Sequence, residues 1–165
     1  MFNKTLSKLA EMNDECHSNL QTVMYYAKDD MFVATNGHLM LCQNAVDFHQ
    51  ASDAFFPETD SSYPNIEPVI GQDFSIPVDI VSKKVYKRKK RSSYLTNKVT
   101  IINDSIMFDS KYLSLIEKTF GKNGKWFAEE KCQCFKFIPD DGSGYALLMK
   151  IQFEKFKNED YDEIE

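Results

Sequence analysis

The chain has 165 residues, of which 42% are hydrophobic and 13 are Phe. This length allows one domain with a substantial core and is short for two. The formal charge of −5 excludes a general attraction to nucleic acid but allows contact through a local basic face. No apolar run approaches the roughly 20 residues of a membrane helix, and residues 1–12 lack the core of a signal peptide. We therefore expect a cytoplasmic protein with no membrane partner and four reduced cysteines.

The first part of the chain predicts a helix followed by three strands. Residues 3–13 place apolar side chains on one helical face and charged side chains off it. Residues 20–27 are rich in β-branched and aromatic side chains and end at a turn signal, residues 28–30. Asn36-Gly37 then separates two short apolar runs. This dipeptide predicts a β-hairpin with a type I′ turn, because both residues tolerate a positive φ.

The last part of the chain predicts the same order of elements. Asp109-Ser110 offers an N-cap, the next residues form an apolar helical face, and Gly121 is placed to end the helix. Three strands are expected after it, at residues 125–130, 132–138 and 145–153. Two copies of one helix-plus-three-strand unit indicate an internally duplicated α+β domain. In such a domain, two helices cover one face of an antiparallel sheet.

The segment between the two units, residues 47–98, differs in character. Its prolines interrupt any long element, and residues 83–91 contain seven cations and no acid. A strand is expected at residues 99–107, leading back to the second unit. We interpret the segment as an insertion in a single domain of residues 1–157. Residues 158–165 are acidic and are expected to form a disordered tail.

Three segments resemble a known family. Residues 33–38, Val-Ala-Thr-Asn-Gly-His, are similar to the Val-Ala-Thr-Asp-Gly-His hairpin of the bacterial sliding clamps, the beta subunits of DNA polymerase III. Residues 62–70 resemble the linker between clamp domains, and residues 145–153 resemble the end of a clamp domain. The resemblance implies a DNA-clamp-like fold and a non-enzymatic role in DNA replication, with no cofactor. A clamp ring contains six domains, so a ring of this shorter chain would be a homo-oligomer of about six copies.

The helices of clamp domains line the central hole and pass close to duplex DNA. The resemblance therefore implies that lysines outside the apolar helix faces contact phosphates without reading bases. These candidate DNA-binding residues are Lys4, Lys8, Lys111 and Lys118. Without the resemblance, the same residues would be interpreted as ordinary solvated lysines.

Clamps bind the tail of DNA polymerase at the hairpin, in a pocket that the last strands of the following domain complete. The matching candidate peptide-binding residues are Thr35, Gly37, His38, Met40, Leu147 and Met149. An apolar cleft with Met in its wall suits a short extended peptide, because Met adapts to varied side chains. The resemblance thus implies docking of DNA polymerase or other clamp-binding peptides. The alternative is a tight hairpin beside buried strand residues.

The basic run of residues 83–91 is a second candidate for contact with DNA. Its cations are Lys83, Lys84, Lys87, Arg88, Lys89, Lys90 and Arg91. Each phosphate contact would add to the salt dependence of binding, and Tyr86 and Tyr94 could stack on exposed bases. The alternative interpretation is a flexible, solvated loop.

No catalytic or metal site is predicted. No Ser or Cys nucleophile has a recognisable acid–base pair, and we expect His38 to bind a backbone carbonyl instead of acting as a base. Cys132 and Cys134 would share one face of a strand, and with Cys16 and His17 they could form a zinc site. Structural zinc sites more often use cysteine knuckles on turns, so buried reduced thiols are the preferred interpretation.

The sequence therefore predicts a processivity factor that resembles a sliding clamp, or a clamp-related DNA-associated adaptor. Two alternatives stay open. One is a monomeric or dimeric nucleic-acid-binding module that uses residues 83–91. The other is a protein–protein adaptor without affinity for DNA.

Overall fold

The computed structural model describes residues 4–45, 63–93 and 95–165. The first of these ranges contains a short helix, a 3-10 helix and three strands. They are α1 (Lys4–Ala10), η1 (Glu15–Leu20), β1 (Met24–Tyr26), β2 (Met31–Thr35) and β3 (Leu39–Asn44). Among the described residues, no helix is long and apolar enough to cross a membrane.

The remaining elements follow in two groups. The first group consists of α2 (Glu67–Ile70), β4 (Ile76–Val78), β5 (Lys83–Arg88), β6 (Lys98–Ile102) and β7 (Ile106–Asp109). The second group consists of α3 (Ser110–Phe120), β8 (Gly124–Ala128), β9 (Cys134–Pro139), β10 (Gly144–Met149), η2 (Phe153–Lys155), η3 (Asn158–Asp160) and β11 (Tyr161–Glu163).

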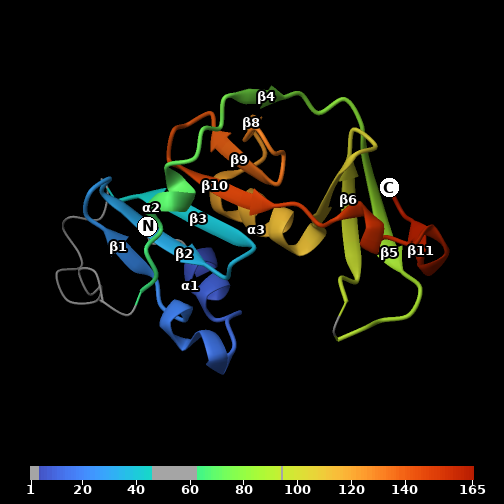
Figure 1. Ribbon diagram of the computed structural model, residues 1–165, viewed down its shortest axis with the longest axis horizontal. Coiled ribbons are helices and arrows are strands. Elements are labelled where there is room, and N and C mark those ends of the chain that lie inside the picture. The colour runs from blue at the N-terminus through green and yellow to red at the C-terminus, as the bar shows by residue number, and fades with distance from the viewer. Residues whose placement is uncertain (1–3, 46–62, 94) are drawn as a thin grey trace.

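The fold is α+β, with two antiparallel sheets (Figure 1). The larger sheet has the strand order β1-β2-β3-β10-β9-β8-β4. The three strands that follow α1 therefore lie on one side of its centre, and the three that follow α3 lie on the other. They meet where β3 pairs with β10, with Leu41 opposite Ala146. The smaller sheet has the order β11-β5-β6-β7 and lies beyond α3 in Figure 1.

Both longer helices pack on the same face of the larger sheet. Leu6 and Leu9 of α1 and Leu115 and Ile116 of α3 belong to one buried cluster. The same cluster contains apolar residues of five strands of the larger sheet, among them Phe32, Ala34, Leu39, Leu41, Phe135, Phe137, Ala146 and Leu148. The helices also contact each other, since the hydroxyl groups of Thr5 and Thr119 are hydrogen-bonded at 2.5 Å.

The opposite face of the larger sheet is covered near its centre by residues 63–72, which include α2. Tyr63 and Ile66 are buried there against a second cluster of strand residues. This cluster contains Met24, Met31, Val33, Met40, Cys42 and Leu147. The segment that resembles a clamp linker thus packs on the sheet of its own domain.

The smaller sheet is covered on both faces. On the α3 side, Ile102 and Phe108 enter the main core. On the other side, Tyr161 near the end of the chain packs with Val99, Ile101 and Met107. Residues 151–161 therefore close a small third core.

Several predicted elements differ from the structure. The first helix ends at Ala10, and residues 20–27 contain only the short strand β1. The strand expected at residues 99–107 is a hairpin, β6–β7, because Asn103 and Asp104 adopt positive φ values and reverse the chain. Residues 83–88 of the basic run form strand β5 instead of a loop, and residues 89–91 follow the strand. The tail expected to be disordered contains β11, because its backbone pairs with β5.

Candidate peptide-binding site

The hairpin β2–β3 is present as predicted, but its turn is not type I′. Of the turn residues, only Gly37 has a positive φ, of 84°. Asn36 contributes through its side chain instead: Oδ1 accepts hydrogen bonds from the backbone N–H groups of His38 (3.1 Å) and Leu39 (3.0 Å). The Thr35 hydroxyl donates to the Leu39 carbonyl at 2.9 Å. These side-chain hydrogen bonds stabilise a turn with one positive φ, whereas a type I′ turn requires two.

The hairpin is fixed against the second half of the domain. Asn36 donates from Nδ2 to the Tyr112 hydroxyl of α3 at 2.9 Å. The His38 ring stacks on the Tyr112 ring, with 6.2 Å between centroids. The His38 carbonyl accepts a hydrogen bond from the Met149 N–H at 2.9 Å. Our expectation for the His38 ring was therefore wrong: within the described chain it stacks on tyrosine and makes no hydrogen bond.

A cavity of about 310 Å³ lies between the hairpin, the 64–72 segment and strand β10. All six residues predicted from the sequence line this cavity: Thr35, Gly37, His38, Met40, Leu147 and Met149. In clamps, the hairpin and the completing strand come from successive domains. Here one domain provides both, because β3 and β10 are neighbours in the same sheet.

The cavity has a buried floor and an accessible rim. Leu20, Met40 and Leu147 are at most 8% exposed and form the apolar floor. Val69 and Met149 on the rim are 38% and 46% exposed. An open cavity with an apolar floor can accept apolar side chains from a partner while the partner's backbone stays near solvent.

Part of the wall was not predicted. Leu20, Pro64, Ile66, Val69, Gln72 and Cys134 also line the cavity. For residues 64–70 a signal existed, namely their resemblance to the clamp linker. No local pattern in the sequence indicates that Leu20 and Cys134 reach the same cavity, because each approaches it from a different element.

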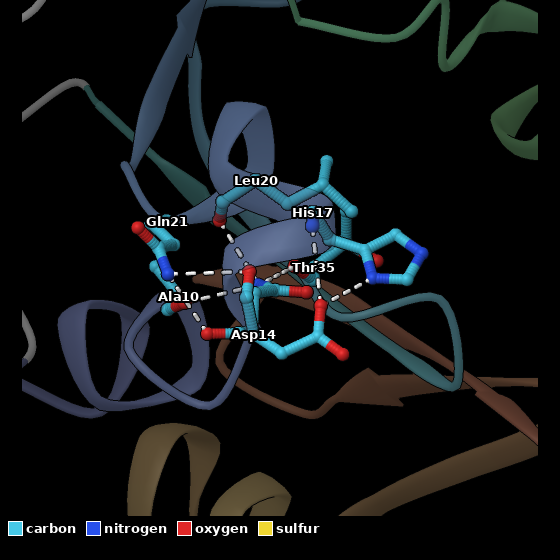
Figure 2. Close-up of polar contacts among 7 residues, drawn as sticks. Ala10, Asp14, His17, Leu20, Gln21 and Thr35 are labelled. Carbon is cyan, nitrogen blue, oxygen red and sulfur yellow. Dashed lines mark hydrogen bonds and ion pairs between the residues drawn. The ribbon is translucent and has the colours of Figure 1, made fainter.

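Asn13 links two parts of this wall. Its Nδ2 lies within hydrogen-bonding distance of the carbonyl oxygens of Ala10 (3.0 Å), Leu20 (3.0 Å) and Thr35 (2.9 Å). Ala10, Leu20 and Thr35 gather around this point in Figure 2. Leu20 and Thr35 both line the cavity, so Asn13 ties the end of α1 to the cavity wall.

The short helix α2 on the opposite wall is fixed by charge and by capping. Glu67 accepts hydrogen bonds from Lys28 Nζ (3.1 Å) and the Tyr26 hydroxyl (3.0 Å). The Asn65 side chain accepts from the Glu67 N–H at 3.0 Å, which satisfies one N–H group of the helix start. The hydrogen bond from Lys28, followed by that from Tyr26, lowers the pKa of the Glu67 carboxyl.

The four helix lysines lie on solvent-exposed positions of α1 and α3. Lys4, Lys8 and Lys118 are exposed. Lys111 has local partners, since its Nζ lies 3.4 Å from Asp109 and 4.7 Å from the centroid of the Tyr112 ring. The structure thus brings the helices side by side, with Lys111 engaged by its neighbours.

The cations of the basic run lie on and just after β5, and several face acidic groups. Lys84 is 2.9 Å from Asp104 and Lys83 is 3.8 Å from Glu117. Arg88 and Lys89 face acids of the C-terminal segment. No ion pair is present within the described chain for three exposed cations, Lys87, Lys90 and Arg91. Tyr94 lies outside the described residues.

The cysteines are not arranged as predicted. Cys132 is exposed in a turn with a φ of 49°, because β9 begins only at Cys134. Burial raises the pKa of the Cys134 thiol to about 11 and that of Cys42 to about 12. The side chain of Cys16 lies outside the described part of the chain. No group of three potential metal ligands occurs among the described residues.

The fold and the cavity define a class: an α+β protein with an apolar groove beside a β-hairpin. In comparisons with protein families, curated proteins and solved structures, no significant match is found. The resemblance to clamps therefore depends on the three short segments of the sequence.

Proposed function

We propose that this protein is a non-enzymatic, clamp-like adaptor of DNA replication. In this proposal, it docks a short extended peptide of a DNA polymerase or another replication partner in the cavity beside the hairpin. One observation carries the proposal: the three segments that resemble clamps are far apart in sequence, yet they line one cavity. They are the hairpin, residues 64–70 of the linker-like segment, and β10.

The strand order supports the same proposal. Each longer helix is followed by three antiparallel strands, and the two sets meet at β3 and β10. Both helices cover one face of this sheet. This is the arrangement expected of the clamp-like duplication that we propose, with the helices available to pass close to DNA.

The chemistry of the cavity fits a peptide better than a reaction. Successive side chains of an extended peptide point to opposite sides, so alternate residues can reach the floor while the others face solvent. Burial of two Leu-sized side chains contributes roughly 3–6 kcal/mol. The costs of association offset much of this contribution, so we expect weak, reversible docking. Weak docking suits a tether that exchanges partners.

Fluorescence anisotropy with a defined probe tests the proposal. The probe is a fluorescein-labelled hexapeptide that alternates Leu with Ser, titrated with the full chain. We expect saturable binding that Met149→Lys or Val69→Lys weakens at least roughly tenfold, because either change brings a charge to the rim of an apolar site. Ile80→Lys is the matched control: Ile80 is 47% exposed and does not line the cavity. An equal effect of all three changes, or no binding by the wild type, would contradict peptide docking.

The proposed contact with DNA is non-specific and uses the outer sides of α1 and α3. Lys4, Lys8 and Lys118 supply positive charge there, and Lys111 lies at the start of α3. Such lysines attract phosphates without sequence preference. Whether the chain encloses DNA as a ring or contacts it as a smaller assembly does not alter this expectation.

A further inference from the structure

We propose that the acidic C-terminal segment, residues 158–165, masks a surface on β5 that binds single-stranded DNA. In this view the segment is an intramolecular competitor for the cations of the basic run. The inference is independent of peptide docking, because it concerns the smaller sheet and not the cavity beside the hairpin.

The segment is attached to β5 through its backbone. Tyr161, Asp162 and Glu163 of β11 pair antiparallel with Arg88, Lys87 and Tyr86. The Lys89 N–H donates to the Asp160 carbonyl at 2.9 Å, and the Val85 N–H donates to the Glu165 carbonyl at 2.7 Å. These bonds do not depend on the charges of the side chains.

Tyr161 is the apolar anchor of the segment. Its side chain is buried, and its hydroxyl donates to the Thr96 carbonyl at 2.7 Å. The ring packs on Phe156, with 4.9 Å between centroids. The anchor and the backbone pairing therefore fix the segment without help from its carboxylates.

The carboxylates of the segment lie beside the cations of β5. Asp160 is 3.8 Å from Arg88, and Asp162 is 3.8 Å from Lys89. Glu163 accepts a hydrogen bond from the Tyr86 hydroxyl at 3.2 Å. Both side chains of the Lys89–Asp162 pair are at least half exposed, so this long ion pair contributes little to folding stability. The main effect of the three carboxylates is to lower the positive potential around β5, which is the property that attracts a polyanion.

The remaining cations are suited to a DNA backbone. Lys87, Lys90 and Arg91 are exposed, and none of them forms an ion pair within the described chain. Asp162 lies directly across from Lys87 in the β11–β5 pairing. A flexible single strand can follow cations at the end of β5 and in the segment after it, as in other basic surfaces that track a nucleic-acid backbone. Neutralisation of Asp162 would release Lys89 and raise the positive potential at Lys87, which lies directly across from Asp162 in the β11–β5 pairing.

The test uses the full chain and keeps the anchor. In the tail variant, Asp160→Asn, Asp162→Asn and Glu163→Gln remove three charges but keep Tyr161 and the backbone pairing. In the control variant, Asp73→Asn, Glu130→Gln and Asp140→Asn change the net charge equally at exposed sites away from β5. Binding of fluorescein-labelled oligo-dT is measured by anisotropy at several salt concentrations.

We expect the tail variant to bind oligo-dT roughly tenfold more tightly than the control variant at low salt. The plot of log K against log salt should become steeper by up to about 1.4, since each of the two cations, Lys87 and Lys89, adds roughly 0.7 to the slope for a single strand. Addition of Lys87→Gln and Lys89→Gln to the tail variant should abolish the gain.

Equal affinities of the tail and control variants would overturn the inference. The segment would then only cover an otherwise open sheet edge. The single change Asp162→Asn, at a side chain that is 67% exposed, gives the same comparison against Asp140→Asn with minimal risk to folding. A failure of this inference would leave the peptide titration unchanged, so the two proposals are tested separately.

Discussion

Asn13 shows how one side chain can shape a binding surface that it does not line. Its Nδ2 contacts carbonyl groups on both sides of the cavity wall, at Leu20 and Thr35. Asn13→Ala leaves these carbonyls without their donor, so we expect the free energy of unfolding to fall by about 2 kcal/mol. Urea denaturation measures the change, with Asn123→Ala, at an exposed loop position, as the control. If Asn13→Ala lowers the free energy of unfolding by no more than the control does, water must replace the hydrogen bonds of the Asn13 side chain.

The backbone conformation at position 37 requires glycine, although a larger side chain would fit there. Its φ is 84°, and a Cβ atom built at this position would meet nothing within 4 Å. Gly37→Ala should therefore lower the free energy of unfolding by about 1 kcal/mol through backbone strain alone. Thermal denaturation tests this value. An unchanged or higher midpoint would mean that the turn relaxes to another conformation.

Helix α2 is too short to be stable alone and depends on its attachments. The pKa of Glu67 is lowered by its hydrogen bonds with Lys28 and Tyr26, so the folded state favours the ionised carboxylate. This contribution to stability is present above the unfolded pKa of Glu and is lost as the pH falls through the lower, folded pKa. We expect Glu67→Gln to be less stable than the wild type at neutral pH and to lose less stability on acidification. Urea denaturation between pH 3 and pH 7 measures both curves; parallel curves would contradict the role of Glu67.

The elements that the sequence predicts well have strong local signals. Helix α3 begins after Asp109, whose side chain accepts a hydrogen bond from the Lys111 N–H, and it ends at Gly121, with a φ of 79°. These residues act within their own segment, so their pattern is visible in the sequence. Strand β11 has no such signal, because partners more than 70 residues away determine its position. The charge of its residues instead favours a prediction of disorder.

At the scale of the whole molecule, the candidate site could be predicted only where the resemblance supplied long-range information. Hydrophobic pattern alone cannot bring Thr35 and Leu147 together, since their strands are separated by more than 100 residues. The clamp resemblance indicated both residues but placed the second one on a following domain, so the meeting of both within one domain was not predicted. It did not predict Leu20 or Cys134, because their neighbours are determined by the packing of η1 and β9 in this chain.

The outer surfaces of the helices provide the test for contact with DNA. Replacement of all four helix lysines by Ala should weaken binding of duplex DNA at low salt and reduce the salt slope by about 3, because Lys111 is already engaged by Asp109. Anisotropy with a labelled duplex measures both quantities. The matched control replaces four other lysines that lie off these helices: Lys125, Lys131, Lys150 and Lys157. Equal losses of affinity in the two variants would show that only the net charge of the protein matters, and not the position of the helix lysines.

The central claim is that an apolar peptide occupies the cavity beside the hairpin, and methionine methyl groups report on it most directly. Met40 lies in the floor and Met149 on the rim, whereas Met12 and Met107 do not line the cavity. In a protein labelled with ¹³C at the Met methyl groups, titration with the Leu/Ser hexapeptide should shift the signals of Met40 and Met149 and leave those of Met12 and Met107 in place. Shifts confined to Met12 or Met107, or no shifts at saturating peptide, would contradict the account.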